Sequence, residues 1–389
     1  MIPYGRQDVT DADIAAVVAV LRSEFLTQGP EVPKFEAAVS AYCGSGYAVA
    51  VSNATAALHL ACLALEVGRG DRVWTSPISF VASANCALYC GADVDFVDVE
   101  PESGNLSVSK LADKLRHARA AGTLPKVVIP VHLCGRPCDL VSIHALSREF
   151  GFRILEDASH AIGARYLDGP IGNCRYSDAA VFSFHPVKVM TTGEGGMFVT
   201  NDATLAARVV RTRNHGITRQ PEEMTRPPDG PWYYQQIDLG YNYRMTDIQA
   251  ALGSSQLTRL DAAIAKRNRL AERYDRLLAG LPLELPPRAM HQISAMHLYI
   301  VRLVSPSVIG AHRAIFESMR EAGIGVNLHY IPIHLQPYYQ QHGFSAATFP
   351  EAERFYSRAI SLPMYPTLTE EEQDLVVRGL KNAILAHSR

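Results

Sequence analysis

The sequence predicts an α/β protein, with a mostly parallel seven-stranded sheet in a large domain and a smaller C-terminal α/β domain. Up to residue 200, short apolar runs rich in β-branched residues alternate with longer helical patterns, which is typical of βαβ units. The chain has 389 residues, of which 48% are hydrophobic and 20% charged, so it can bury a large core. A long helical pattern begins near Thr246. We therefore expect residues 1–245 to form the large domain with an N-terminal arm, and residues 246–389 to form a linking helix and the small domain.

Each strand of the large sheet is expected where an apolar run is bounded by turn-forming residues. These runs are Tyr47–Ser52, Arg72–Ser76, Val94–Val99, Lys126–His132, Arg153–Glu156, Ala179–Phe184 and Gly196–Thr200. The spacing of apolar residues after Thr246 predicts one long helix with charges on its other face. Further along, we expect strands at His297–Val304 and Ile324–His329 and helices near Ile309–Ala322, Ala352–Ala359 and Glu370–Ala386. The Pro-rich, polar segment Arg219–Trp232 is expected to be a long exposed loop.

The charge balance and the apolar pattern limit the classes of partner. Lysine and arginine number 37 against 39 aspartates and glutamates, a formal net charge of −2, so we expect no nucleic-acid binding. The most apolar stretch, residues 47–67, contains Ser52, Asn53 and His59, which are costly in hydrocarbon, and we expect no membrane span. Residues 1–8 lack a basic segment followed by an apolar one, so a cytoplasmic protein is expected.

The seven cysteines lie mostly in apolar contexts, which favours reduced core residues. Cys134 and Cys138 lie near His132 in the sequence, but no CxxC pair and no fourth ligand at a zinc-like spacing accompanies them. We therefore expect structural cysteines and no metal site.

The first motif is a strand that runs into a helix with small residues at its start. The strand Tyr47–Ser52 leads into Asn53, Ala54 and Thr55. The free N–H groups of a helix N-terminus bind anions, and Thr55 adds a hydroxyl, so a phosphate would fit there. The alternative is a simple N-cap by Ser52 or Asn53. The sequence contains no Walker GxxxxGK[ST] and no GxGxxG, which argues against NTP hydrolysis and NAD chemistry.

Two further motifs follow apolar strands. Asp157 and His160 come where the strand Arg153–Glu156 ends, which is where ligands sit in open α/β sheets. Lys188 follows the strand Ala179–Phe184 and precedes a glycine-rich turn, and such a site disfavours a charged amine unless the amine is used. Lys188 is therefore a candidate Schiff-base lysine. The alternative for Asp157 is a buried structural carboxylate, and the alternative for Lys188 is a lysine that reaches solvent from a strand end.

Together these motifs supply what pyridoxal phosphate (PLP) requires: a helix N-terminus for the phosphate, an anion for the pyridinium nitrogen and a lysine for the aldehyde. The 31 residues from Asp157 to Lys188 leave room for a connection and a further strand, so both side chains can reach one ring from neighbouring strands.

These motifs resemble the DegT/DnrJ/EryC1 family of PLP-dependent nucleotide-sugar aminotransferases, which have the fold called type I. The matching segments run from Tyr4 nearly to the end of the chain. They are residues 52–59, 77–82, 156–160, 182–188, 240–249 and 361–363. This resemblance implies a PLP-dependent aminotransferase and a homodimer with shared active sites.

The resemblance also assigns roles to residues around the cofactor. Lys188 would bind the cofactor aldehyde and then shuttle a proton. Asp157 would pair with the protonated ring nitrogen, His160 would lie near the ring oxygen and Phe80 would stack on the ring. The phosphate would be held by Ala54, Thr55 and Ser183, and Asn242 would reach the phosphate of the neighbouring protomer's cofactor.

Within the family, the likeness is strongest to the transaminases of pseudaminic acid biosynthesis, which aminate the C4 ketone of UDP-2-acetamido-2,6-dideoxy-β-L-arabino-hexos-4-ulose. Residues 25–30 with 32–36, 77–80 and 329–333 carry this finer likeness. It implies a UDP-sugar substrate and glutamate as amino donor. The substrate residues it implies are Tyr4, Glu24, Phe25, Leu26, Thr27, His329, Tyr330 and Ile331. Several of these, such as Phe25 and Ile331, could instead belong to the core.

Other functions stay open at this point. Transaminases for other nucleotide 4-keto-6-deoxy sugars, of the bacillosamine or perosamine type, share much of the pattern. A noncatalytic regulatory protein on the same fold would not need Lys188. A Rossmann oxidoreductase fits the fold class but lacks the glycine fingerprint.

Overall fold

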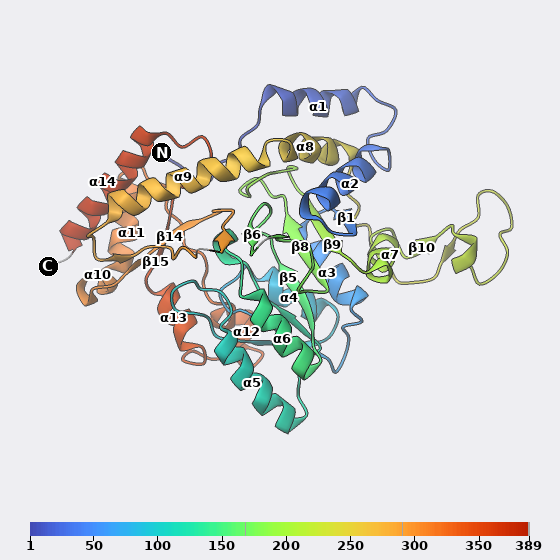
Figure 1. Cartoon of the computed structure of the whole chain (residues 1–389), viewed down its shortest axis with the longest axis horizontal. Helices are drawn as coiled ribbons and strands as arrows, with labels where there is room; N and C mark the ends of the chain where they lie inside the picture. Colours follow the sequence, from blue (N-terminus) through green and yellow to red (C-terminus); the bar gives the residue numbers. More distant parts are fainter. Residues whose placement is uncertain (168, 290, 388–389) are drawn as a thin grey trace.

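The computed structural model describes residues 1–167, 169–289 and 291–387, and a seven-stranded sheet lies at its centre (Figure 1). The strand order is β1-β9-β8-β5-β4-β2-β3. The bounds are β1 (Tyr47–Val51), β2 (Arg72–Thr75), β3 (Asp93–Phe96), β4 (Val127–Ile129), β5 (Arg153–Asp157), β8 (Ala179–Ser183) and β9 (Gly196–Thr200). Strand β9 is antiparallel to β1 and β8, while the pairs β8–β5, β5–β4, β4–β2 and β2–β3 are parallel. The predicted sheet is confirmed.

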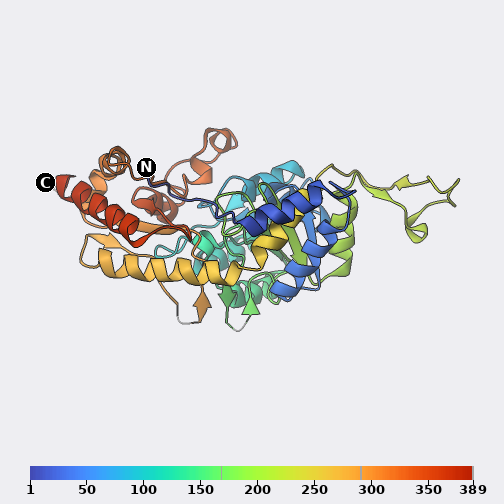
Figure 2. The ribbon, with the colours of Figure 1, turned by 90° about the horizontal axis from the view of Figure 1, so that it is seen from above.

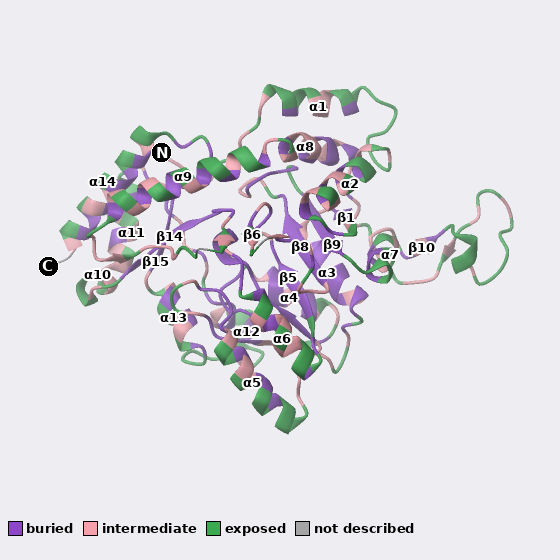
Figure 3. Cartoon of the chain, viewed as in Figure 1, coloured by how far each residue is buried: buried purple, intermediate pink, exposed green. Residues whose placement is uncertain are grey.

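Helices cover both faces of this sheet, because successive side chains of each strand point to opposite sides. In β4, Val128 packs with one set of helices, and Val127 and Ile129 pack with the other. The first set is α2 (Glu31–Cys43), α5 (Val108–Ala121) and α6 (Leu140–Phe150); the second is α3 (Ala54–Ala64), α4 (Ala82–Tyr89) and α7 (Ala203–Thr212). The inner strands of the sheet are mostly buried, the edge strands β1 and β3 are partly exposed, and the outer helix faces are exposed (Figure 3).

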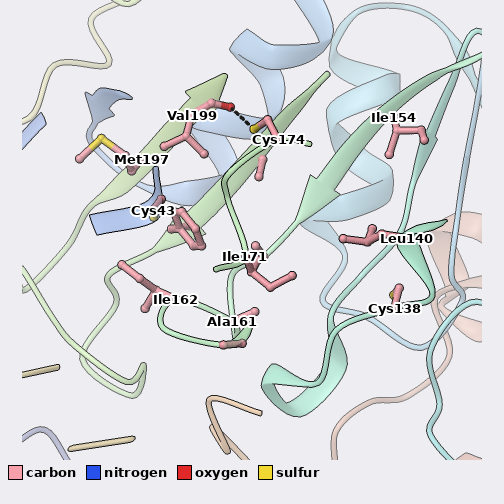
Figure 4. Close-up of a cluster of buried hydrophobic side chains, with 14 of the residues drawn as sticks. Cys43, Cys138, Leu140, Ile154, Ala161, Ile162, Ile171, Cys174, Met197 and Val199 are labelled. Carbon is pink, nitrogen blue, oxygen red and sulfur yellow. Dashed lines mark hydrogen bonds between the residues drawn. The ribbon is translucent and has the colours of Figure 1, made fainter. Parts of the chain in front are cut away.

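One of the two cores includes several of the cysteines (Figure 4). Cys43, Cys138 and Cys174 are buried there, and the Cys174 thiol donates a 3.4 Å hydrogen bond to the Val199 carbonyl. All seven cysteines are free thiols, as the sequence predicted.

The predicted long helix after Thr246 is instead two helices, α8 (Asp247–Leu257) and α9 (Leu260–Leu278). The break lies at Arg259, whose backbone leaves the helical region with φ −117° and ψ 12°. Its guanidinium contacts Asp8 at 2.8 Å and Asp13 at 2.6 Å. These ion pairs attach the N-terminal arm, including α1 (Asp11–Leu21), to the break. A tertiary contact therefore accompanies the interruption of a helical pattern that is continuous in the sequence.

The C-terminal part contains a three-stranded antiparallel sheet of order β12-β14-β15. Its strands are β12 (Leu283–Glu284), β14 (Tyr299–Leu303) and β15 (Ala359–Leu362), and its helices are α10 (Pro306–Gly310), α11 (His312–Glu321), α12 (Pro337–Gln340), α13 (Pro350–Tyr356) and α14 (Glu370–His387). The predicted strand Ile324–His329 is wrong, since only isolated bridges form at Ile324 and Asn327. The predicted helix Ala352–Ala359 ends at Tyr356, and β15 follows it. The domain boundary at Thr246 stays a prediction.

A narrow hairpin projects from the body beyond α7 (Figures 1 and 2). Its paired ends are β10 (Ile217–Thr218) and β11 (Gln235–Gln236), and a 3-10 turn at Pro221–Glu223 lies between them. Most residues of the segment Arg219–Trp232 are exposed, as predicted. A second small sheet consists of β6 (Arg165–Tyr166), β7 (Gly169–Pro170) and β13 (Gln292–Ile293). Within the described ranges, no helix has the length and apolar character needed to cross a membrane.

Candidate active site

The carboxyl ends of β5 and β8 open into a cavity of about 890 Å³. Its walls combine the N-terminus of α3, the turns after these two strands, the first residues of the chain and the loop before η3 (Ile333–Leu335). Among its lining residues, the sequence had predicted Tyr4, Ala54, Thr55, Phe80, Asp157, His160, Ser183, Lys188, His329 and Tyr330. Segments that lie far apart in the sequence therefore meet at one site, where ligands of open α/β sheets bind.

Asp157 is the last residue of β5 and is fixed by hydrogen bonds to both carboxylate oxygens. Oδ2 accepts from the Ser83 hydroxyl at 2.5 Å, and Oδ1 accepts from the Ser159 N–H at 3.1 Å. Ser79 lies 2.6 Å from Ser83, and because Ser83 donates to Asp157, Ser79 is left to donate to Ser83. This relay holds a 5% exposed carboxylate in one orientation at the cavity wall.

Lys188 lies in the turn that follows β8. The turn is closed by backbone hydrogen bonds from Phe184 to Gly195 at 2.9 Å and from Thr192 to Phe184 at 3.0 Å. Burial lowers the pKa of Lys188 to about 8, and the negative charge of Asp157 opposes this shift. About a tenth of the amine is therefore neutral at pH 7, and the neutral amine is the form that attacks a carbonyl.

His160 lies between Tyr330 and His297. Its Nε2 is 3.1 Å from the Tyr330 hydroxyl, and its ring centroid is 4.4 Å from that of His297. Burial, and to a lesser degree the charges of Lys188 and His329, hold the pKa of His160 well below its ordinary value. Nδ1 of His160 and Nδ1 of His297 are buried without a hydrogen-bond partner among the described residues. Such atoms are rare in proteins.

His329 and Tyr4 also line the cavity. The Nδ1 atom of His329 is 2.8 Å from the Ser361 hydroxyl, and its ring centroid is 5.5 Å from that of Tyr4. Burial and the charge of Lys188 lower the pKa of His329 to about 3. His329 is thus neutral at physiological pH and can hydrogen-bond without adding charge.

The N-terminus of α3 approaches β9 closely. Asn53 is the N-cap and accepts a 2.8 Å hydrogen bond from the Ala56 N–H, so the side chain serves the helix as the alternative interpretation expected. A Cβ at Gly196 would lie 2.5 Å from the Asn53 carbonyl carbon and 2.7 Å from the Ala54 nitrogen. Glycine is therefore required at position 196 for the helix start to reach the cavity.

Some predicted residues do not line this cavity. They are Glu24, Phe25, Leu26, Thr27, Asn242 and Ile331. Half of the Phe25 side chain is exposed, and Asn242 is exposed beside Asn214, with which it forms a bridge. Their predicted contacts with cofactor or substrate stay predictions.

Other lining residues were missed by the sequence analysis, among them His297 and Glu194, as was Ser83, which lies behind Asp157. His297 precedes β14, and no local pattern shows that it returns to His160. Ser83 follows the Pro77–Phe80 block by one helical turn. Its hydroxyl lies on the inner face of a helix that starts beside the site, and this position could have indicated a role for Ser83 there.

The residues of the cavity fit PLP. A helix N-terminus, a fixed carboxylate and a lysine with a lowered pKa share one cavity, and the polar rings of His160 and Tyr330 line it. These groups match the phosphate, the pyridine nitrogen, the aldehyde and the polar ring substituents of this cofactor.

Comparison with known proteins agrees with this chemistry. The chain is 35% identical over 387 residues to the spore coat polysaccharide biosynthesis protein SpsC of Bacillus subtilis (strain 168). The alignment covers 98% of this chain and 97% of that protein. It is similar to Helicobacter pylori PseC, an aminotransferase involved in the biosynthesis of pseudoaminic acid, with 30% identity, 99% coverage of both chains and a TM-score of 0.90. The PLP form of the putative sugar aminotransferase Spr1654 from Streptococcus pneumoniae gives 30% identity, 99% coverage of both chains and a TM-score of 0.89.

Residues 7–381 match the DegT/DnrJ/EryC1/StrS aminotransferase family. This match spans nearly the whole chain and includes every segment that lines the cavity except Tyr4. The chain therefore belongs to the DegT/DnrJ/EryC1/StrS aminotransferase family and is a PLP-dependent sugar aminotransferase.

Proposed function

We propose that the enzyme transfers an amino group from glutamate to the C4 ketone of UDP-2-acetamido-2,6-dideoxy-β-L-arabino-hexos-4-ulose. The product is UDP-4-amino-4,6-dideoxy-N-acetyl-β-L-altrosamine, an amino sugar of the pseudaminic acid pathway. The observation that supports this substrate is the full-length similarity to PseC, with a TM-score of 0.90. The proposal places the enzyme in the cytoplasm.

Lys188 and Asp157 carry the central steps of this proposal. PLP, when bound, supplies an electron-withdrawing ring that stabilises negative charge on the carbon that loses a proton. Lys188 would take that proton and return it at the cofactor's C4′ carbon, a task suited to an amine with a pKa near 8. Asp157 keeps a proton on the ring nitrogen, and its hydrogen bond from Ser83 holds the carboxylate in place.

The other residues hold the cofactor. Ala54, Thr55 and Ser183 line the cavity at the helix start and the end of β8, where N–H and hydroxyl groups bind a phosphate. His160 is neutral and faces the cavity, so it can hydrogen-bond the ring oxygen. Phe80 is 60% exposed and lines the cavity, which leaves its face free to stack on a ring.

The two substrates use the cavity in turn. Glutamate gives up its amino group and departs as 2-oxoglutarate before the sugar enters, so one site serves both. His329 and Tyr330 line the cavity and would contact the sugar or the donor carboxylate through neutral hydrogen-bonding groups.

A second copy of the chain would complete the site. Segment 24–27 and Asn242 are exposed and do not line the cavity of their own chain. In a homodimer these residues would face the partner's cavity, with Asn242 at the cofactor phosphate. The projecting hairpin supports an association, since Trp232 is 73% exposed and Tyr234 is 50% exposed.

A different nucleotide 4-keto-6-deoxy sugar is the second candidate. SpsC, a polysaccharide biosynthesis protein, shares 35% identity with this chain, against 30% for PseC. A substrate of the bacillosamine or perosamine type would fit that similarity.

A substrate panel separates these candidates. The enzyme would be given PLP, glutamate and each nucleotide 4-keto sugar in turn, and kcat/KM would be measured from the 2-oxoglutarate formed. The proposal predicts that the UDP-linked β-L-arabino sugar has the highest kcat/KM, by about 10-fold or more, as pocket contacts of about 1–3 kcal/mol allow. A higher kcat/KM for another sugar would retain the aminotransferase and transfer the assignment to that sugar.

A further inference from the structure

Glu156 is a buried acid beside Asp157 that the amino transfer does not use. It lies in β5 directly before Asp157 and is 1% exposed. Because successive side chains of a strand point to opposite faces, Glu156 points away from the face that carries the Asp157 side chain. It shares its face with Ile154, which packs in the core under α2, α5 and α6. A carboxylate in such a core is costly unless hydrogen bonds or an opposite charge compensate it.

Both oxygens of the Glu156 carboxylate accept hydrogen bonds. Nε2 of His132 lies 2.8 Å from Oε2, and the Ser177 hydroxyl donates to Oε1. His132 is fully buried, and its Nδ1 accepts a 3.0 Å hydrogen bond from the Cys138 N–H. The ring proton is therefore on Nε2, which donates to Glu156. Every polar atom of these two side chains has a partner, and such satisfied networks rigidify a core.

The same contacts join the end of β4, the end of β5 and the start of β8. His132 follows β4, and Ser177 precedes β8. The His132 N–H also donates to the Asp157 carbonyl at 3.1 Å, and the Asp157 N–H donates to the Pro130 carbonyl at 2.9 Å. The residue that holds the Glu156 side chain therefore also holds the Asp157 backbone.

Asp157 is thus held from both faces of the sheet. On the cavity side, the Ser83 hydroxyl orients its carboxylate. On the opposite face, the pair formed by Glu156 and His132 fixes the backbone from which that carboxylate projects. We propose that Glu156 and His132 are positioning residues of the amino transfer, which keep the Asp157 carboxylate in place for the ring nitrogen of the cofactor. This inference rests on the role proposed above for Asp157.

The pH profile of PLP capture by the apoenzyme tests the proposal. The negative charge of Asp157 raises the pKa of Lys188, and this effect depends on where the carboxylate lies. Glu156→Ala removes both hydrogen bonds on the far face of β5. The midpoint of capture should therefore fall, by about half or more of the shift that Asp157→Asn gives. The glutamate half-reaction should slow by about 10-fold or more, because a small misplacement of a catalytic group is costly.

Further variants separate position from charge. Glu156→Gln removes the charge but keeps an acceptor for His132, so it should rescue the midpoint toward the wild-type value. Ser177→Ala keeps the charge and removes one hydrogen bond at a partly exposed position. It should shift the midpoint in the same direction by less, and it tests the proposal even if Glu156→Ala does not fold. Glu149→Ala is the matched control, because it removes an exposed carboxylate of α6 and should leave the midpoint in place.

The double variant shows whether Glu156 acts through Asp157. In Glu156→Ala with Asp157→Asn, the midpoint should equal that of Asp157→Asn alone. A further fall in the double variant, a midpoint in Glu156→Gln as low as in Glu156→Ala, or a wild-type midpoint in folded Glu156→Ala or Ser177→Ala would overturn the proposal and leave the role of Asp157 intact. A wild-type midpoint in Asp157→Asn would overturn both.

Discussion

The amine of Lys188 determines the pH range in which the apoenzyme can capture its cofactor. Its pKa lies near 8, below the ordinary lysine value, because the side chain is buried in the cavity. Since the neutral amine attacks the aldehyde, the rate of PLP capture should rise from about pH 6 and level off near pH 9. Stopped-flow absorbance of the cofactor measures this rate. A rate that does not change across this range would contradict the account.

Asp157 opposes the shift at Lys188, so its removal should move the same pH profile. Asp157→Asn deletes the negative charge that raises the Lys188 pKa, and the midpoint of PLP capture should fall below pH 8. Asp139→Asn is the matched control, because Asp139 is an exposed N-cap that asparagine replaces well. A midpoint that stays in place in Asp157→Asn, or moves equally in the control, would be inconsistent with this coupling.

Ser83 is a positioning residue, because it acts on the cofactor through Asp157. Ser83→Ala removes the 2.5 Å hydrogen bond to Oδ2, and hydrogen bonds to charged groups contribute about 1.5–3 kcal/mol. We expect the glutamate half-reaction to slow by about 10-fold, while Ser83→Thr restores part of the rate. Single-turnover kinetics with glutamate measure this, with Ser254→Ala as control, since the Ser254 hydroxyl has no hydrogen-bond partner among the described residues. Equal rates in the two alanine variants would refute the role.

Among the site residues, the sequence predicted those that directly follow strands. It missed those that come from distant parts of the chain. Asp157 and Lys188 could be recognised because strand ends converge at one edge of a sheet. His297 could not, because its contact with His160 spans more than a hundred residues and depends on how β14 meets the large sheet.

At the scale of elements, the start of α3 depends on one glycine in β9. Gly196→Ala would place a Cβ 2.5 Å from the Asn53 backbone, and relief of this clash must move the helix start. We expect the free energy of unfolding to fall by about 1–3 kcal/mol. Relative to the wild type, the variant should lose more affinity for PLP than for pyridoxal, which lacks the phosphate. Thermal melts and equilibrium dialysis measure the two effects.

Gly68→Ala is the control for this prediction. Gly68 follows α3, and a Cβ there would meet no atom within 4 Å. Its variant should bind PLP as the wild type does. If Gly196→Ala also bound PLP normally, the helix start would not be the phosphate site.

The elements themselves were predictable where burial dominates. The inner strands β4, β8 and β9 are buried on both faces and appear as nearly continuous apolar runs. Residues 324–329 place an apolar side chain at every second position, yet they pair only at single points, with Ile2 and Ser361. The break between α8 and α9 was missed because the ion pairs of Arg259 come from the N-terminal arm, which a local pattern does not show.

At the scale of the whole molecule, the account predicts a dimer in which each active site uses two chains. Lys188→Ala and Asn242→Ala homodimers should each be impaired. In a mixed dimer, one site keeps both Lys188 from one chain and Asn242 from the other. Mixing the variants under exchange conditions should therefore restore up to about a quarter of wild-type activity, since half of the dimers are mixed and each has one intact site. No recovery, in samples shown by light scattering to be dimers, would contradict the shared site.

The overall architecture followed from the alternation of strand and helix patterns, which fixes a layered α/β fold before any residue contact is known. The projection of the hairpin from the body did not follow from the sequence (Figure 2). Its polar, proline-rich sequence predicted exposure, but the direction in which it leaves the body depends on α7 and on the pairing of β10 with β11.

The central claim is that Lys188 transfers an amino group from glutamate to a nucleotide-linked 4-keto sugar. The most direct test incubates the enzyme and its Lys188→Ala variant with PLP, ¹⁵N-glutamate and the UDP-linked β-L-arabino 4-keto sugar, and records the mass spectrum of the nucleotide sugars. The account predicts a ¹⁵N-labelled 4-amino sugar from the wild type and unchanged ketone from Lys188→Ala. A labelled product at the wild-type rate from Lys188→Ala would contradict it.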